Sequence, residues 1–225
     1  AVLFRAGLRA TDAVVVQSAD QVGLARSRFP RLDPIQINSF VEPAPPSDAP
    51  GEAFLWVSRL VDYKRPLLYA DLAAAVPEAR FWMIAIETLD DAYASTLAEL
   101  RRRAAALPNL ELLDQRAHAE LQALIGRAIA MVNTSSFEGM PNTWLEGWAR
   151  GVPALTLSFD PDGRIAAHAL GVAAAGDWEA FVAATRRLWE RRADRDGRSG
   201  TVRAYVEDAH GTSVAAAWAE LVERL

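Results

Sequence analysis

Short apolar runs alternate with longer segments of helical periodicity along this chain, and this alternation restricts its possible folds more than any other feature. The predicted strands cover residues 12–16, 35–38, 54–58, 81–86, 110–113, 129–133 and 153–157. The predicted helices cover residues 19–28, 66–76, 91–106, 118–127, 142–150, 177–193, 200–209 and 213–224. Because single helices of this length separate successive strands, we expect right-handed crossovers within a parallel sheet. The fold class predicted is therefore α/β, with a Rossmann-like parallel sheet covered by helices on both faces.

The composition excludes several classes of protein. The chain has 225 residues, 51% of them hydrophobic, which is enough for one large core or two small ones. Its formal net charge of -5 argues against nucleic-acid binding, which needs a basic excess. Cysteine is absent, so disulfides and thiolate metal sites are excluded, and no apolar run approaches the length of a membrane span. The chain begins at Ala1 without methionine or a cleavable signal, so we interpret it as a processed chain or an excised piece and expect a cytoplasmic location.

A proline-rich stretch divides the chain into two unequal parts. The sequence VEPAPPSDAPGE, residues 41–52, contains four prolines and a glycine, and we interpret it as a linker. The predicted division is an N-terminal unit, residues 1–45, and a larger domain, residues 46–225. A strand of the N-terminal unit would expose an unpaired edge, so we expect residues 1–40 to pack irregularly, to swap between chains or to drive self-association. The last helix carries an apolar stripe that suits either its own core or a neighbouring domain: Val214, Trp218, Leu221, Val222 and Leu225.

Two cations follow the predicted strand 54–58. Arg59 and Lys64 lie in the stretch SRLVDYKRP, in the region where ligands bind in parallel α/β sheets. An arginine fork and a lysine ammonium together could hold a diphosphate. A solvated loop, with Asp62 balancing part of the charge, is an equally good interpretation of these residues alone.

The loop after the predicted strand 129–133 contains two glutamates in the sequence FEGMPNTWLE, residues 137–146. A helix beginning near Asn142 would place Glu138 before it and Glu146 one turn inside it. The N-terminal end of such a helix presents unpaired N–H groups, here those of Asn142 and Thr143, to an anion such as a phosphate. The alternative is purely structural: Glu146 would complete a capping box with Thr143, and Glu138 would favour the helix dipole.

Together the two loops resemble a known family. The segments FLWVSRLVDYKRP and NTSSFEGMPNTWLEGWARGVPALTL are similar to the donor half of retaining glycosyltransferases of family 4, which have the GT-B fold. The two glutamates match that family's E-x7-E signature, and the resemblance is good over residues 50–165. It implies that the chain binds a nucleotide diphosphate sugar, UDP- or GDP-linked, for retaining transfer to an unknown acceptor, with no metal or other cofactor. It further implies that residues 1–45 are the remnant of an N-terminal acceptor domain, and that the isolated chain is inactive.

The same resemblance implies roles for individual residues. Arg59 and Lys64 match the pair that holds the diphosphate and stabilises it as the leaving group. Glu138 is expected near hydroxyls of the transferred sugar, Glu146 at the ribose, and the amides of residues 140–143 at the sugar or phosphate. The candidate donor-binding residues are Arg59, Lys64, Glu138, Gly139, Met140, Pro141, Asn142, Thr143 and Glu146, with Arg59, Lys64 and Glu138 as the catalytic candidates. Full-length members of the family often associate peripherally with membranes.

The sequence also departs from the family pattern. Ser58 replaces the usual glycine before the arginine, and AIETLDD, residues 85–91, stands where a glycine-rich turn often occurs. Asp160 and Asp162 spell the D-x-D metal signature of another glycosyltransferase fold, but here they follow a late strand, which favours a loop near the cleft over a metal site. The three histidines, His118, His168 and His210, are dispersed and favour structural roles.

Two other functions fit the same residues. One is a nucleotide-sugar epimerase-like domain, whose catalytic acids would lie outside this chain. The other is a non-catalytic binding or scaffold domain that keeps the fold without turnover. A dinucleotide oxidoreductase is disfavoured because no G-x-G-x-x-G follows a predicted strand.

Overall fold

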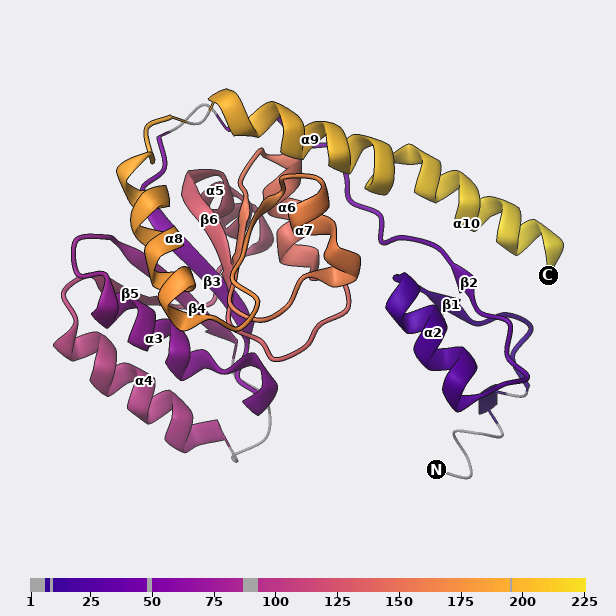
Figure 1. The fold of residues 1–225 in the computed structure, drawn as a ribbon, viewed down its shortest axis with the longest axis horizontal. Coiled ribbons are helices and arrows are strands. Elements are labelled where there is room, and N and C mark those ends of the chain that lie inside the picture. The colour runs from indigo at the N-terminus through magenta and orange to yellow at the C-terminus, as the bar shows by residue number, and fades with distance from the viewer. Residues whose placement is uncertain (1–6, 9, 48–49, 87–92, 195) are drawn as a thin grey trace.

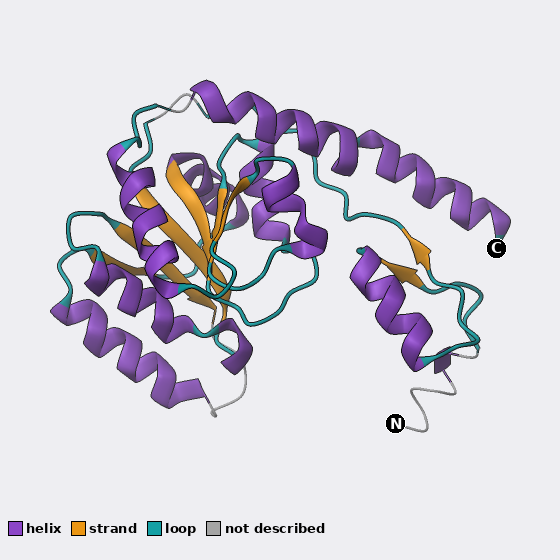
Figure 2. Cartoon of the chain, in the orientation of Figure 1, coloured by secondary structure: helices purple, strands orange, loops and turns teal. Residues whose placement is uncertain are grey.

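A parallel sheet of six strands forms the centre of the larger part of the chain (Figure 2). The computed structural model describes residues 7–8, 10–47, 50–86, 93–194 and 196–225. The strands are β3 (Ala53–Arg59), β4 (Phe81–Ile86), β5 (Leu110–Leu113), β6 (Ala128–Asn133), β7 (Ala154–Thr156) and β8 (Gly171–Ala173). They are arranged in the order β5-β4-β3-β6-β7-β8, and every neighbouring pair is parallel. The predicted α/β fold with a parallel sheet is confirmed.

Helices cover both faces of this sheet (Figure 1). The helices are α3 (Pro66–Ala75), α4 (Ala94–Ala106), α5 (His118–Arg127), α6 (Asn142–Ala149), α7 (Arg164–Ala167), α8 (Trp178–Glu190) and α9 (Asp196–His210). Side chains of α3, α4 and α8 pack with Phe54 and Trp56 in one core. Those of α5, α6, α7 and α9 pack with Leu55 and Met131 in the other. Alternate side chains of β3 therefore enter opposite cores, as expected for a strand buried on both faces.

The N-terminal residues form a separate small unit beneath the last helix, α10 (Thr212–Arg224) (Figure 1). Its strands, β1 (Val15–Val16) and β2 (Ile35–Gln36), pair in parallel with each other and do not join the main sheet. The helix α2 (Ala19–Arg28) lies between them in sequence, and the hydroxyl of Ser18 accepts the N–H of Gln21 at 3.2 Å to cap it. Ile37 is buried against α10, so an apolar contact joins the unit to the end of the chain.

The apolar stripe of α10 divides between core and surface. Val214 and Leu221 are buried against the N-terminal unit. Trp218, Val222 and Leu225 remain exposed, with Leu225 67% accessible. Two of the five stripe residues thus pack within the chain, against its own N-terminal unit.

The proline-rich stretch follows the surface of the larger part. Its backbone N–H groups at Val41 and Ser47 donate to carbonyls of α9 and of the segment after α6, at 3.0 and 3.3 Å. These bonds hold the stretch in place although prolines exclude it from a sheet. The placement of a domain boundary there stays a prediction.

Several boundaries differ from the predictions. Strand β8 was not predicted, because it is only three residues long and begins with Gly171. Predicted strands 12–16 and 35–38 shorten to two residues each. The first residues of predicted helix 91–106 and most of the stretch AIETLDD lie among residues 87–92, outside the part that the structure describes. None of the helices described is long and apolar enough to cross a membrane.

Candidate functional site

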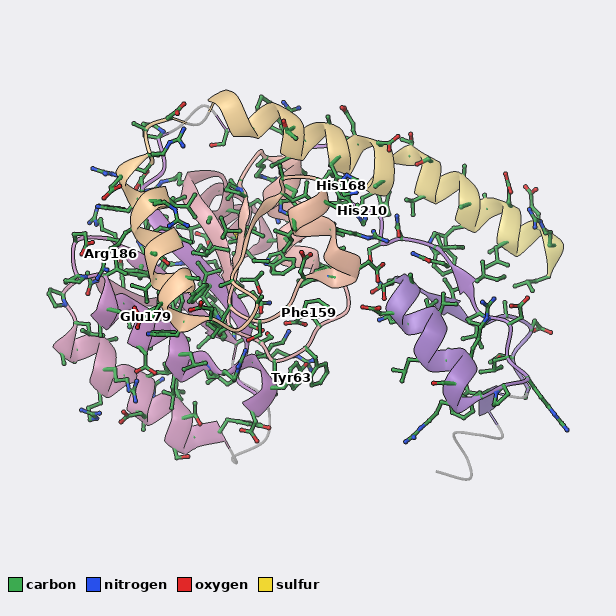
Figure 3. The ribbon with its side chains drawn as sticks, in the orientation of Figure 1. Tyr63, Phe159, His168, Glu179, Arg186 and His210 are labelled. Atoms are coloured by element: carbon green, nitrogen blue, oxygen red, sulfur yellow. The ribbon has the colours of Figure 1, made fainter. Side chains whose placement is uncertain are left out.

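The loops after β3 and β6 lie side by side at one end of the sheet. From β3 the chain builds outward through β4 to β5, and it then returns to place β6 on the other side of β3. Loops that follow the two strands at such a switch point diverge and leave room for a ligand. The loops contact each other, because the N–H of Ser136 donates to the carbonyl of Tyr63 at 2.8 Å. Figure 3 labels Tyr63 of the loop after β3 and Phe159 of the loop after β7, and both strands belong to the same parallel sheet.

The structure pairs Lys64 with Glu138. The ammonium of Lys64, in the short 3-10 helix η1 (Asp62–Lys64), donates to Glu138 Oε1. The same oxygen accepts hydrogen bonds from the Ser135 hydroxyl at 2.6 Å and from the Asn133 amide at 3.2 Å. The side chains of Lys64 and Glu138 are only 14% and 10% exposed. In this structure the lysine charge is therefore balanced by a carboxylate within the site.

Lys64 has no counterpart elsewhere in the sequence. The chain contains 24 basic residues, and Lys64 is the only lysine among them. A compact ammonium serves as a point charge for phosphate, whereas arginine binds as a planar fork. The composition alone therefore distinguishes this position, a signal that the spacing of the motifs does not contain.

Arg59 occupies the exposed end of β3. Its guanidinium forms no hydrogen bond or ion pair with another residue in the described parts of the chain. The structure thus places Arg59 at the last position of β3 and Lys64 in the turn that follows, and of the two only Lys64 contacts Glu138. Asp62, the expected counter-charge in this loop, is exposed to solvent at the start of η1.

Arg65 fastens the two loops together, although no sequence motif marks it. It adopts a left-handed backbone conformation, with φ of 47°, between η1 and α3. Its guanidinium donates to the carbonyls of Thr134 and Ser135 at 2.5 and 2.8 Å, and to the hydroxyl of Ser158 at 2.6 Å. Burial lowers the pKa of this guanidinium from its ordinary value. No local pattern in the sequence indicates an arginine with positive φ, since this conformation is uncommon in residues other than glycine.

The second loop leads into α6 as predicted. Pro141 precedes the helix, and its side chain provides no cap. Among the described residues, nothing accepts a hydrogen bond from the backbone N–H groups of Asn142 and Thr143. These N–H groups and the positive end of the helix dipole form a seat for an anion.

Glu146 lies one turn inside α6 and is half-buried. The capping box with Thr143, the structural alternative for this glutamate, does not form. Within the part of the chain that the structure describes, the carboxylate of Glu146 has no hydrogen bond or ion pair, and only its backbone carbonyl accepts one, from Arg150 at 3.0 Å. Gly139 and Met140 complete the loop between Glu138 and α6, and Met140 is buried.

Two aromatic rings form one rim of the site. Tyr63 and Phe137 stack with their ring centres 4.7 Å apart and their planes inclined by 24°. Lys64 Nζ lies 5.2 Å from the centre of the Tyr63 ring, within the range of a cation–π contact. Phe137 is 60% exposed, so the outer part of this rim faces solvent.

The two carboxylates of the D-x-D sequence are used for backbone contacts. Asp160 accepts the N–H groups of Ile165 and Ala166 at 2.8 and 3.2 Å. Asp162 accepts those of Ala19 and Asp20 at 3.0 and 3.1 Å. Over the described residues, no three histidine, aspartate or glutamate side chains form a cluster that could hold a metal ion.

The histidines lie outside this site. His210 is buried, and its Nδ1 lies 2.7 Å from the carbonyl oxygen of Ser39. The pKa of His210 is lowered, mainly by burial. The hydrogen bond with Ser39 raises the pKa in part, and the charge of Arg164 lowers it further. The rings of His168 and Tyr205 of α9 pack with their centres 4.7 Å apart and their planes inclined by 39° (Figure 3). His118 is exposed at the start of α5.

Comparison with protein families identifies the larger part of the chain. The family model described as glycosyl transferases group 1 matches residues 51–191, which is more than half of the chain. No curated protein matches the sequence.

Solved structures share the fold. A point mutant of S. aureus TarM, in complex with fondaparinux, alpha-GlcNAc-glycerol and UDP, is 17% identical with a TM-score of 0.79, over 95% of this chain and 44% of TarM. Anabaena HepE in complex with UDP and glucose is 14% identical with a TM-score of 0.80, over 100% of this chain and 66% of HepE. Sucrose-phosphate synthase from Thermosynechococcus elongatus is 18% identical with a TM-score of 0.79, over 99% of this chain and 60% of the synthase. The chain thus spans less than half of TarM.

Proposed function

The chain belongs to the group 1 glycosyl transferases, and on that premise we propose that it binds a nucleoside diphosphate sugar as the donor half of a retaining enzyme of family 4. The nucleotide we propose is UDP, which accompanies TarM and HepE in their structures. The acceptor half would come from sequence beyond this chain, which spans only part of the proteins with the same fold. Turnover is therefore proposed for the full-length protein, with a hexosyl group as the sugar transferred.

One observation carries this proposal. At the switch point of the sheet, the only lysine of the chain pairs with a largely buried carboxylate, and the loop of that carboxylate leads into a helix whose first N–H groups have no partner among the described residues. Lys64 and the amides of Asn142 and Thr143 supply the positive charge and donors that a diphosphate needs. Glu138 supplies the acceptor that a sugar hydroxyl needs. Both requirements of a nucleotide sugar are met within two adjoining loops.

Donor binding would exchange one partner of Lys64 for another. The diphosphate takes the ammonium, and Glu138 is released to accept a hydroxyl of the transferred sugar while Ser135 and Asn133 continue to orient it. Arg59, exposed and without a partner in the described residues, would approach the diphosphate from the solvent side. Glu146 would accept from the ribose.

The proposed chemistry is electrostatic. As the bond from the anomeric carbon to the phosphate oxygen breaks, negative charge develops on the diphosphate and positive charge on the sugar ring. Cations and helix N–H groups already directed at the phosphate stabilise that separation. Lys64, Arg59 and α6 would thereby take the place that a metal ion has in other transferases, and we propose that the reaction is metal-independent.

Calorimetric titration with UDP, GDP and ADP tests the proposal. We expect the chain to bind UDP in preference to GDP and ADP, and the Arg59→Ala/Lys64→Ala variant to lose most of that affinity. Arg224→Ala is the matched control, because among the described residues this arginine pairs only with exposed Glu220 on the same helix. If no nucleotide binds to a folded wild-type chain, or if the double variant binds as well as the wild type, the proposed site is wrong.

The single lysine permits a second, independent readout. An amine-selective acylating reagent can modify only Lys64 and the chain's α-amino group. We expect the bound nucleotide to protect Lys64 and leave the α-amino group reactive, which peptide mass spectrometry resolves. Equal modification of Lys64 with and without saturating nucleotide would place the phosphate elsewhere.

A further inference from the structure

Two glutamines of the N-terminal unit approach the loop that carries Glu138, at Gly139. A Cβ atom placed on Gly139 would lie 3.1 Å from Gln21 Nε2 and 3.4 Å from Gln17 Oε1. Gly139 directly follows Glu138, the candidate ligand of the sugar. A Cβ at this position would crowd the amide of Gln21, so the approach of α2 gives a second reason for glycine here.

The orientation of Gln21 is fixed by a hydrogen bond. Its Oε1 accepts the backbone N–H of Gln17 at 2.7 Å, which directs Nε2 toward Gly139. The start of α2 is itself held against the larger part of the chain, because Asp162 accepts the N–H groups of Ala19 and Asp20 at 3.0 and 3.1 Å. The carboxylate also pairs with Arg164 at 3.2 Å. The amide of Gln21 is therefore positioned by contacts that do not involve a ligand.

The polar atoms directed at Gly139 have unused hydrogen-bonding capacity. In the described residues, neither Nε2 of Gln21 nor Oε1 of Gln17 has a hydrogen-bond partner, and both side chains are half-buried. Nε2 of Gln21 is a hydrogen-bond donor and Oε1 of Gln17 is an acceptor. A sugar hydroxyl both donates and accepts, so such a pair suits it, whereas a phosphate offers no proton to Gln17.

We propose that Gln21 and Gln17 form the second wall of the sugar pocket and bind hydroxyls of the transferred sugar opposite Glu138. The inference rests on the proposed function, which it deepens by naming residues that select the sugar. Recognition of the sugar then depends on α2, outside the part matched by the family model. The nucleotide itself contacts only the larger part of the chain.

The variant Gln21→Glu changes one group of the side chain. The glutamate side chain has the size of glutamine, and one of its carboxylate oxygens can still accept the N–H of Gln17. The other oxygen replaces the Nε2 donor with an acceptor next to Glu138. Calorimetry with UDP and with UDP-glucose separates the two halves of the donor. We expect an unchanged Kd for UDP and a Kd for UDP-glucose raised about tenfold, the effect of losing one hydrogen bond in a site. If the wild-type chain prefers GDP, then GDP and GDP-mannose replace these probes.

Gln36→Glu is the matched control, because Gln36 is an exposed glutamine of the same N-terminal unit on β2. It should bind both ligands as the wild type does. Unchanged binding of UDP-glucose by Gln21→Glu would overturn the inference. Equal weakening of UDP and UDP-glucose would also overturn it, because the residue would then act through the fold and not through the sugar. If the wild-type chain binds no nucleotide at all, the proposed function fails first, and that result is distinct from either outcome.

Discussion

Removing the positive charge of Lys64 should destabilise the chain even without a ligand. Glu138 is 10% exposed and Lys64 is 14% exposed, so the pair is largely shielded from water. Breaking a fully buried pair by removing one partner costs about 3–5 kcal/mol, because an uncompensated charge stays behind. Glu138 would still accept hydrogen bonds from Ser135 and Asn133. For Lys64→Met we therefore expect a loss of about 2 kcal/mol in the free energy of unfolding.

The partner variant should cost less. In Glu138→Gln the side chain keeps an oxygen that accepts from Lys64, so we expect a loss of about 1 kcal/mol. The double variant Lys64→Met/Glu138→Gln removes both charges. Its loss should be smaller than the sum of the two single losses by about 1 kcal/mol, which is the coupling energy of the pair.

Urea unfolding of the four proteins at pH 7, followed by tryptophan fluorescence, measures these values. Arg224→Ala reports on an exposed pair within one helix and should change the free energy of unfolding by less than about 0.5 kcal/mol. The reasoning is refuted if Lys64→Met behaves like this control, or if the two single losses simply add. Either result would mean that Lys64 and Glu138 are not paired in the ligand-free chain.

Two further effects follow from contacts near the site and near α9. Arg65→Ala removes three hydrogen bonds and keeps the unfavourable φ, so urea unfolding should show a loss of about 3 kcal/mol, whereas Arg65→Gly should lose about 1 kcal/mol less. For His210, the folded pKa is lowered below the ordinary value of 6.5, so its contribution to stability is present above that value and is lost as the pH falls through the folded pKa. His210→Gln should reduce this acid sensitivity in thermal unfolding, and His118→Gln, at an exposed position, should leave it unchanged.

The sheet was predictable because its strands are nearly continuous apolar runs. Strand β4 and strand β5 have the predicted bounds, since each run is limited by turn residues or by a polar residue. Strand β8 lies in the apolar run ALGVAAA, residues 169–175, whose glycine and alanines have weak strand propensity. Its Gly171 has φ of 152°, and a Cβ there would lie 1.9 Å from the carbonyl oxygen of Ala154, so close packing of two backbones defines this strand.

The sequence predicted where the candidate site residues lie in the fold, but it did not predict the contacts between them. Arg59, Lys64 and Glu138 were placed at neighbouring strand ends by the order of strands and helices. The ion pair of Lys64 with Glu138 joins residues 74 positions apart, and no local pattern specifies it. The approach of α2 is of the same kind, because Asp162 bonds to Ala19 across 143 positions. Contacts of this range depend on the whole fold and not on periodicity.

The three hydrogen bonds of Arg65 have a consequence for affinity. A loop that orders only when its ligand arrives loses conformational entropy at that moment, and binding weakens accordingly. Here Arg65 ties the loop that carries Lys64 to the loop that carries Glu138 before any ligand is present. The conformational entropy of these loops is therefore lost during folding, and it is not lost again when a ligand binds. If the proposed donor binds here, the unusual backbone conformation of Arg65 contributes to affinity through the two loops that it holds in place.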